Sequence, residues 1–386
     1  MTGNPPHVGG TGPSDTGELL RADDAAMARL VLSQAVEPGD AKVGQAVCRW
    51  GAVVVLDRLD SGHGGSIGLD LLAGRWQPQE SRDCAERELD RAAELAVRFV
   101  VPGSTAWPTQ LDDLGVRAPL ILRVMGAASL RSVAVRSVAI VGARAATRYG
   151  ESVAEDLASG LVSAGWAVVS GGAFGIDAAA HRGSLAAAGV SVAVSAAGVD
   201  RPAPLANTSL FMRLYDTGAV ISEMPLGARP SRSRFLVRNR VIAALSRCVV
   251  VVEAAQRSGA RATAREAANL GRVVAAVPGP VSSAMSAGCH EMIRDEHAVL
   301  VTDAEQVVEL LVAGVAEPTS QHVSQDEQLV LDLLSTDRTC SVDVLAAGAG
   351  LDVGRAVSLL LSLENRGLAS RDRDGWSGGT RYVPRA

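Results

Sequence analysis

The chain has 386 residues, enough for two or three domains at about 150 residues each. Hydrophobic residues make up 47% of it and charged residues 20%, which excludes a disordered chain and supplies a core. Averaged over the whole chain, the net charge of −5 argues against nucleic acid as a partner. Of the 37 basic residues all but Lys42 are arginine, a bias that indicates a GC-rich coding sequence.

The cysteines and the N-terminal residues indicate the cellular compartment in which the protein is expected. The five cysteines are an odd number and form no C-x-x-C pair, which argues against a disulfide framework and a structural zinc site. No apolar run reaches the roughly 18 residues of a membrane span, and residues 1–17 lack the features of an export signal. We therefore expect a cytoplasmic protein with no metal ion, no cofactor and no membrane contact, and a disordered tail over residues 1–17.

A helical region and a connector are predicted next. Residues 18–98 show helical spacing of apolar residues, clearest between Glu80 and Arg98. Residues 99–136 place prolines around short apolar runs, so they are predicted to form a connector of strands and turns.

Beyond the connector, short β-branched runs alternate with alanine-rich helices at intervals of about 25 to 30 residues. Strands are expected to begin near the following residues: Val138, Ala167, Val190, Ala219, Cys248, Val273 and Ala298. The alternation predicts an α/β fold with a doubly wound, mainly parallel sheet, which with its connector covers residues 99–315. Such sheets bind ligands beyond the carboxyl ends of their strands, so the loops there are where a site is expected.

The C-terminal part of the sequence predicts a separate small domain. Residues 316–324 are polar and predict a linker, and residues 325–386 hold three helical stretches and a glycine-rich hairpin, typical of a winged helix. In the latter range nine acidic residues outnumber seven arginines. Two roles therefore stay open for this domain, protein contact or dimerisation on one hand and duplex binding on the other.

Two of the expected strand ends carry candidate phosphate contacts. After the first strand, Gly142 permits close approach and Arg144 stands beside a helix N-terminus. After the run that begins at Cys248, Ser258, Gly259 and Thr263 surround another helix start. Each group has a structural alternative, since an arginine can pair with a carboxylate and a serine or threonine can simply cap a helix.

A glycine-rich turn follows the second expected strand. Ser170, Gly171 and Gly172 end that strand, and Gly175 stands directly before the next helix. Backbone N–H groups of such a turn approach an anion closely, and the helix dipole adds positive charge. Asp177 is placed as the N-cap of that helix. Tight packing of strand on helix without a ligand is the alternative interpretation.

An arginine-rich stretch is the most informative part of the sequence. Residues 229–247 contain six arginines, and no Asp or Glu occurs between Glu223 and Glu253. In a chain of net charge −5 this stretch predicts a concentrated positive patch.

The same stretch contains an aromatic residue among its charges. If a helix starts near Phe235, then Phe235, Arg238 and Asn239 share one face, and the ring would stack on a base while arginines contact the backbone of a single strand. Arg240 points elsewhere and would serve a neighbouring phosphate or a buried pair. In the alternative, Phe235 is buried in the core and the arginines form a solvated face.

Taken together, these motifs resemble the DNA-processing protein A family, DprA, also called Smf. The resemblance covers about residues 95 to 312 in order and spacing, and the flanks resemble the family's helical N-terminal extension and winged helix. The motifs that carry it are Gly142-Ala-Arg144, Ser170 to Asp177, Phe235-x-x-Arg-Asn-Arg240, Ser258-Gly to Thr263-Ala, Gly271-Arg272 and Pro278-Gly279.

The resemblance implies an extended Rossmann-like domain that binds single-stranded DNA as a homodimer. It further implies a protein that protects incoming strands in natural transformation and homologous recombination, and that loads the RecA recombinase without catalysing a reaction. By position, the residues implied to line the DNA pocket are Arg144, Arg232, Phe235, Arg238 and Asn239. Those implied to shape it are Gly171, Gly172 and Gly175.

Three positions depart from the family pattern. Phe174 stands where the glycine turn usually has a basic residue, Leu236 where a proline often follows the motif's Phe, and His290 where an asparagine often follows Gly-Cys. Phe174 removes one positive charge, which would lower DNA affinity unless Arg261 compensates.

Two other classes of function compete with this interpretation. A nucleotide-processing enzyme similar to the phosphoribohydrolases would need a Pro-Gly-Gly-x-Gly-Thr-x-x-Glu turn, whereas Pro278-Gly279 is followed by Pro280-Val281 and no such glutamate. A duplex-binding regulator would act through the winged helix, and the excess of acidic residues there counts against it.

Overall fold

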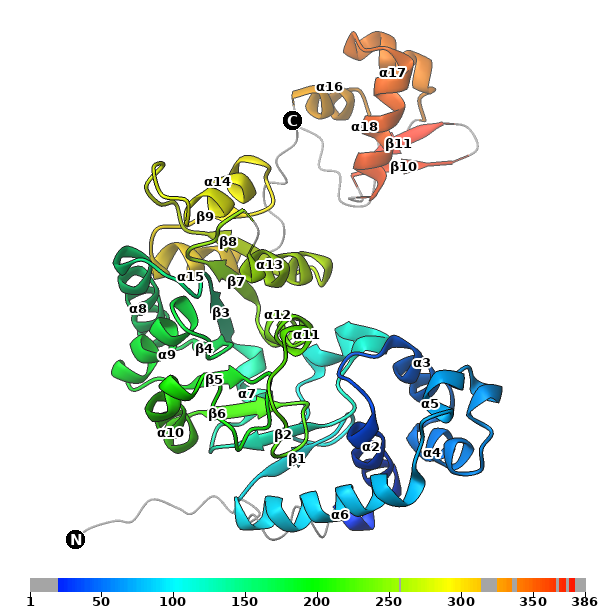
Figure 1. The fold of residues 1–386 in the computed structure, drawn as a ribbon. Coiled ribbons are helices and arrows are strands. Elements are labelled where there is room, and N and C mark those ends of the chain that lie inside the picture. The colour runs from blue at the N-terminus through cyan, green and yellow to red at the C-terminus, as the bar shows by residue number, and fades with distance from the viewer. Residues whose placement is uncertain are drawn as a thin grey trace, which may run out of the picture. The chain divides into compact units, whose positions relative to one another are not determined.

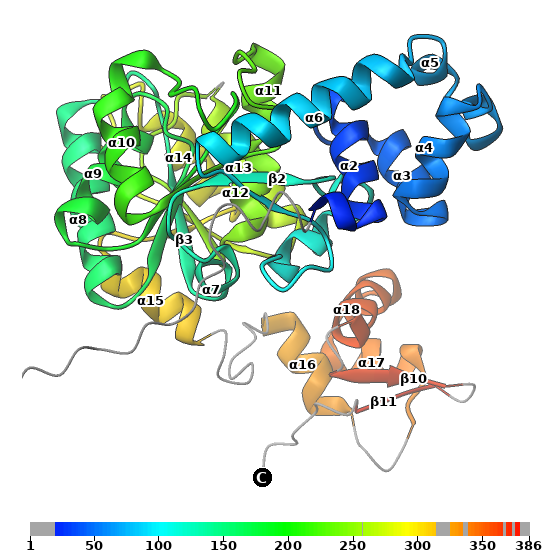
Figure 2. The same ribbon diagram turned by 90° about the horizontal axis from the view of Figure 1, so that it is seen from below.

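The computed structural model describes residues 20–256, 258–313, 325–334, 339–365, 368–372 and 375–378. The chain forms two compact units, Met1–Val312 and Ala313–Ala386, whose elements are labelled in Figure 1 and seen from below in Figure 2. The predicted tail, residues 1–17, and the predicted linker, residues 316–324, lie outside the described residues.

The helical region predicted near the N-terminus is present and belongs to the first unit. Its elements are α2 (Asp24–Ala35), α3 (Ala41–Trp50), α4 (Ala52–Asp60), η1 (Gly64–Ile67), α5 (Asp70–Ala73) and α6 (Pro78–Glu94). Two carboxylates start the first helices, because Asp23 and Asp40 accept hydrogen bonds from backbone N–H groups of the first turn. Leu30, Val55 and Leu89 pack in their common core.

A buried ion pair joins this helical region to the sheet. The Arg123 guanidinium donates to both oxygens of Glu88 at 3.0 and 2.7 Å, and also to the Ser33 hydroxyl. Burial alone would raise the pKa of Glu88, but Arg123 and the hydrogen bonds from Leu226 N–H and the Gln34 amide lower it. Because this pair is buried and fully hydrogen-bonded, it fixes the helical region against the strands.

The sheet has nine strands in the order β1-β2-β6-β5-β4-β3-β7-β8-β9. Their bounds are β1 (Arg98–Val100), β2 (Leu122–Met125), β3 (Ser137–Val141), β4 (Ala167–Ser170), β5 (Ser191–Val194), β6 (Ala219–Ser222), β7 (Cys248–Val251), β8 (Val273–Ala276) and β9 (Val299–Leu300). All seven strands expected from the sequence are confirmed, and they pair in parallel.

The connector contributes more than the prediction stated. β1 and β2 add an antiparallel edge to the sheet, where Val124 pairs with Ile221 of β6. Two helical elements that the sequence did not predict lie in the same segment, η2 (Thr109–Arg117) and α7 (Leu130–Val135). The connector is therefore part of the sheet domain, with Trp107 and Leu111 in its core.

Helices cover both faces of the sheet. Successive side chains of a strand point to opposite faces, and all five residues of β3 are buried, so both faces must be covered. Val138 and Ile140 of β3 pack with α8 and α9, whereas Ala139 and Val141 pack with α12 and α13. The remaining helices of the unit are α8 (Arg148–Ser163), α9 (Ile176–Ala186), η3 (Leu205–Asn207), α10 (Thr208–Thr217), α11 (Arg232–Val237), α12 (Asn239–Leu245), α13 (Gly259–Asn269), α14 (Ala287–Arg294) and α15 (Ala304–Ala313).

The strand order contains one reversal. From β3 the chain builds β4, β5 and β6 on one side, and then returns to place β7, β8 and β9 on the other. The carboxyl ends of β3 and β7 therefore flank a topological switch point, where loops diverge and leave room for a ligand.

The second unit is a winged helix, as the sequence predicts. It contains α16 (Gln325–Leu333), α17 (Val342–Ala349), α18 (Val353–Asn365) and the hairpin strands β10 (Ala369–Arg371) and β11 (Trp376–Gly378). Leu345, Leu360 and Trp376 are buried in its core. Arg355 of α18 forms an ion pair of 3.1 Å with Asp326.

No single helix among the described residues has the length and apolar character needed to cross a membrane. The bent pair Val342–Ala349 and Val353–Glu364 satisfies length and composition only when its two helices are taken together.

Candidate DNA interface

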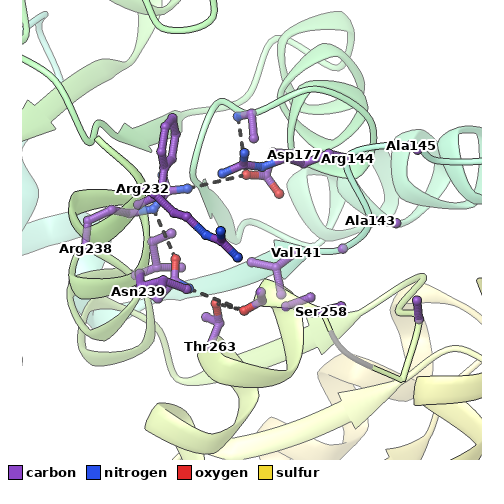
Figure 3. Close-up of a pocket in the computed structure, with 18 of the residues that line it drawn as sticks. Val141, Ala143, Arg144, Ala145, Asp177, Arg232, Arg238, Asn239, Ser258 and Thr263 are labelled. Carbon is purple, nitrogen blue, oxygen red and sulfur yellow. Dashed lines mark hydrogen bonds and ion pairs between the residues drawn. The ribbon is translucent and has the colours of Figure 1, made fainter. Parts of the chain in front are cut away.

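A cavity of about 610 Å³ lies at the switch point (Figure 3). Its wall combines the loop after β3, the start of α9, helices α11 and α12, and the N-terminus of α13. The residues of the predicted site that line it are Arg144, Arg232, Phe235, Arg238, Asn239, Ser258, Gly259 and Thr263. Eight predicted residues from three separate segments are thus brought together by the fold.

Phe235 lies half-buried in the cavity wall. The Arg144 guanidinium carbon is 4.4 Å from the centre of its ring, and that of Arg238 is 5.8 Å away. Both distances suit cation–π contact. Since the ring borders the cavity, the alternative that places Phe235 in the core is wrong.

Arg144 and Arg232 supply the accessible positive charge of the cavity. Both side chains are exposed, and neither forms a salt bridge with another described residue. A guanidinium presents several N–H donors in a planar fork that matches a phosphate. These two arginines are therefore the groups best placed to bind an anionic ligand.

Arg238 has a different role, because it is only 7% exposed. Its guanidinium donates to the carbonyl oxygen of Gly171 at 2.7 Å and to that of Val194, and it lies 3.9 Å from a carboxylate oxygen of Asp177. It also donates to the Asn239 side-chain oxygen at 3.2 Å. Burial lowers the pKa of Arg238 to about 10, so the group stays protonated at neutral pH.

Asp177 gives the cavity a buried carboxyl group. Burial raises its pKa, an effect opposed by the charge of Arg238 and by a hydrogen bond from Ala173 N–H. The prediction that Asp177 is the N-cap of α9 is wrong, because Gly175 holds that position. Its carboxylate instead closes the turn that follows β4 and faces Arg238.

The glycine turn shapes the cavity from behind, as the resemblance implied, and does not line it. A side chain at Gly171 would meet the Arg238 guanidinium at 2.1 Å. Gly172 and Gly175 have φ of +70° and +72°, a conformation that favours glycine. Gly171 permits the close approach of Arg238, whereas a side chain at Gly172 would meet Phe211 and one at Gly175 the carbonyl oxygen of Ala143. The three glycines do not line the cavity, so the expected phosphate cradle of this turn is not part of its surface.

Ser170 also belongs to the framework. It is fully buried, and its hydroxyl donates to the carbonyl oxygen of Ile140 at 2.7 Å. The prediction of Ser170 as a direct DNA contact is therefore wrong, because the strand end that carries it is covered.

The N-terminus of α13 forms the opposite wall, as Figure 3 shows for Ser258 and Thr263. The Asn239 amide donates to the carbonyl oxygen of Gly259 at 3.3 Å, which ties α12 to this helix start. The Ser258 hydroxyl is buried and has no hydrogen-bond partner in the part of the chain that is described. Because Ser258 makes no capping bond, capping does not account for it.

The arginine-rich stretch forms two short helices, whereas one helix from Phe235 was predicted. Ser231 caps the first of them, α11, by accepting a hydrogen bond from Arg234 N–H. α12 follows at once, and Arg238 is the residue between the two. Ser231 also lines the cavity, and it was not predicted from the sequence as a site residue. Serine is a preferred N-cap residue, so its position shortly before the predicted helix could have indicated this helix start.

The predicted positive patch is smaller than the sequence indicated, because acids from distant segments reach three of its six arginines. Arg240 forms a bidentate pair with Glu223 at 2.6 and 2.7 Å and is 1% exposed. Arg234 pairs in the same way with Glu37. The prediction that Arg240 contacts DNA is therefore wrong, and its alternative, a buried pair, is confirmed.

The family departures occupy distinct places. Phe174 is 47% exposed and lies outside the cavity, whereas Leu236 lines it. His290 contacts the backbone of Gly279. Arg261 does not line the cavity and pairs with Glu291 at 2.9 Å, so it does not replace the charge missing at Phe174.

The fold and the cavity define a Rossmann-like protein with an arginine-lined, aromatic site at its switch point and an additional winged helix. A family model described as DNA recombination-mediator protein A matches residues 98–312, and one described as DprA winged helix domain matches residues 315–375. The chain belongs to the DNA recombination-mediator protein A family, which confirms the resemblance seen in the sequence.

Relatives of known name and structure agree with this assignment. The chain is 42% identical to a DNA processing protein DprA of Mycobacterium tuberculosis, over 92% of this chain and 94% of that protein. It is similar to the DprA structure from Streptococcus pneumoniae, with 29% identity and a TM-score of 0.60 over 74% of this chain and 97% of that one. A Helicobacter pylori DprA structure, described by its single-stranded DNA binding mode, matches with 26% identity and a TM-score of 0.50, over 56% of this chain and 96% of that one.

Proposed function

We propose that the chain binds single-stranded DNA at the switch-point cavity and acts there as a recombination mediator. The observation that carries this proposal is the half-buried Phe235, which borders the cavity under the guanidinium of Arg144, with the exposed Arg232 nearby in the cavity wall. Single strands are held by this combination of a stacking surface for bases and positive charge for the backbone.

The geometry favours a single strand over a duplex. A base that enters the cavity meets two flat groups, the Phe235 ring and the Arg144 guanidinium, and bases stack on both. Only an unpaired base exposes its faces in this way. The relative from Helicobacter pylori is described by single-stranded DNA binding, which supports the same mode for this chain.

We propose that no reaction is catalysed at the site. Glu253, the acidic residue at the end of β7, is 1% exposed and accepts hydrogen bonds from the Thr147 N–H and hydroxyl at 2.9 and 2.6 Å. This carboxylate therefore serves the start of α8. A phosphoribohydrolase-like enzyme would need an accessible glutamate near the Pro278-Gly279 turn, and hydrolysis of a nucleoside monophosphate would contradict this part of the proposal.

A salt titration tests DNA binding directly. We expect an oligo-dT of about six nucleotides to bind more tightly than a matched duplex. With Arg144 and Arg232 neutralising about two phosphates, the log–log slope for the single strand should be near −1.4. Preference for the duplex, or a slope near zero, would contradict the proposal.

We propose further that the protein acts in the cytoplasm as a homodimer that protects incoming strands and loads RecA. Its five cysteines are free, which suits a reducing compartment. The test of this part is RecA filament assembly on a strand coated with single-strand binding protein. We expect the chain to accelerate assembly, and an unchanged rate would remove RecA loading from the proposal.

A further inference from the structure

Exposed aromatic side chains are rare among the described residues, and those present lie beside the cavity. Aromatic residues make up 3% of the chain, and among the described residues only two of them are exposed, Phe174 at 47% and Tyr149 at 42%. Neither residue lines the cavity. Exposing these rings to water is unfavourable, and the fold does so at two places on one edge of the sheet.

The two rings flank the cavity on opposite sides. Phe174 follows Ala173, which lines the cavity, in the turn after β4. Tyr149 lies in the first turn of α8, four residues after Ala145, another lining residue, which belongs to the loop before the helix. The Tyr149 hydroxyl donates to the carbonyl oxygen of Pro278, after β8, at 2.7 Å. In the strand order β4-β3-β7-β8, Phe174 and Tyr149 therefore lie on either side of the switch point.

Hydrogen bonds restrict both rings, through the hydroxyl of Tyr149 and through the turn that carries Phe174. The hydrogen bond to Pro278 fixes the orientation of the Tyr149 ring beside the loop that follows β8. On the other side, the Asn207 amide donates to the carbonyl oxygens of Gly172 and Ala173 at 3.1 and 3.3 Å and holds the turn that carries Phe174. A stacking surface that is already ordered loses little conformational entropy when a base binds.

We propose that Phe174 and Tyr149 are outer stacking platforms for the nucleotides of a single strand that extends from the cavity in both directions. This inference rests on the proposed function and adds a path to it, which runs along the carboxyl edge of the sheet from the β4 turn to the β8 loop. It also gives Phe174 a positive role, since a stacking surface replaces the basic residue of the family pattern and lowers the dependence of binding on salt.

The length of this path sets the design of the experiment. Three strand spacings of about 4.8 Å separate β4 from β8, so the outer rings serve different nucleotides from the one on Phe235. Arg148, next to Tyr149, is exposed and available to a phosphate of the same strand. A single nucleotide therefore occupies the cavity alone, and a longer oligomer engages the platforms as well.

The test compares the Phe174→Ala and Tyr149→Ala variants of the full chain on two ligands, thymidine monophosphate and oligo-dT of about 20 nucleotides. Each substitution should weaken binding of the longer oligomer by about 5- to 140-fold, the fold-change that corresponds to one stacked base. Binding of thymidine monophosphate should stay unchanged. Unchanged affinity of both variants for the longer oligomer would overturn the inference while cavity binding persists.

Matched variants separate stacking from other effects. Phe174→Leu keeps apolar volume without an aromatic face and should lose as much affinity as Phe174→Ala, whereas Leu71→Ala, at an apolar residue 82% exposed in α5, should lose none. Phe174→Trp should bind the longer oligomer as tightly as the unaltered chain. The fluorescence of the introduced indole should be quenched by the longer oligomer and not by thymidine monophosphate.

Other outcomes reject the platforms. If Phe174→Ala loses the same affinity for both ligands, Phe174 contributes to binding in the cavity itself and not to an outer platform. A changed oligomeric state in Phe174→Ala or Tyr149→Ala, measured by sedimentation with no change in affinity, would make the rings a contact between protein copies. If the unaltered chain binds neither ligand, the proposed function fails and the inference fails with it.

Discussion

Helices α11 and α12 are consecutive, come from one arginine-rich stretch, and have opposite surroundings. No residue of α11 is buried, whereas all seven residues of α12 are. α11 presents Arg232 and Phe235 to the cavity, and α12 holds Arg240 against Glu223 inside the protein. The same residue type therefore serves recognition in one helix and stability in the next, because the acids that neutralise α12 arrive from other segments.

Removing the buried charge of α12 should have the largest effect. Arg240→Ala leaves the Glu223 carboxylate buried and unpaired, so we expect a loss of about 3–5 kcal/mol in the free energy of unfolding. Urea denaturation measures it. The double variant Arg240→Met, Glu223→Gln should recover most of the loss. If Arg240→Ala is as stable as the unaltered chain but no longer binds DNA, Arg240 is a DNA-binding residue and the structural role is wrong.

On α11 the largest effect should come from the ring. Phe235→Ala removes the stacking surface in the cavity and should weaken binding of oligo-dT by about 1–3 kcal/mol. The slope of affinity against salt should not change, because no charge is lost. Fluorescence anisotropy at several salt concentrations checks both statements, and a reduced slope would show that the ring acts through Arg144.

A charge on α11 should show the reverse signature. Arg232→Gln removes about one phosphate contact, so the salt slope for single strands should become shallower by about 0.7. Arg247→Gln is the matched control, since Arg247 is exposed directly before β7, at the sheet edge opposite the cavity. Equal changes in both variants would mean that the whole stretch acts as a diffuse patch.

The smallest effect is expected at the junction of α11 with the N-terminal helices. Glu37 pairs with Arg234, and its side chain is 63% exposed, so Glu37→Gln should cost only about 0.2–1 kcal/mol of stability. The hydrogen bond from Arg234 lowers the pKa of Glu37. The contribution of the pair is therefore present above the unfolded pKa of about 4.3 and lost as pH falls through the lowered folded value.

Urea unfolding of the unaltered chain and of Glu37→Gln at neutral and acidic pH measures that contribution. The difference between the two proteins should shrink as the pH falls. A difference that grows on acidification would contradict the assigned sign.

Much of the site was predictable because local signals marked it. Gly142, Arg144 and Ser258 follow strands whose β-branched runs are unambiguous, and parallel strands gather their carboxyl ends at one edge. The burial of Ser170 and the pairing of Arg240 with Glu223 were not predictable, since burial and charge pairing depend on which distant segments pack against a residue. The antiparallel edge formed by β1 and β2 was missed for a similar reason, because short strands take their partners from the tertiary fold.

By itself, the sequence determined the alternation of strands and helices and the positions of the strand ends, because apolar periodicity and turn residues act over short distances. The order and spacing of its motifs carried the resemblance to the family. Only the tertiary structure decided which arginines are accessible. Glu37, Asp177 and Glu223 lie outside the arginine-rich stretch yet neutralise three of its charges, because electrostatic interaction depends on distance in space and on burial, and neither is set by position along the chain.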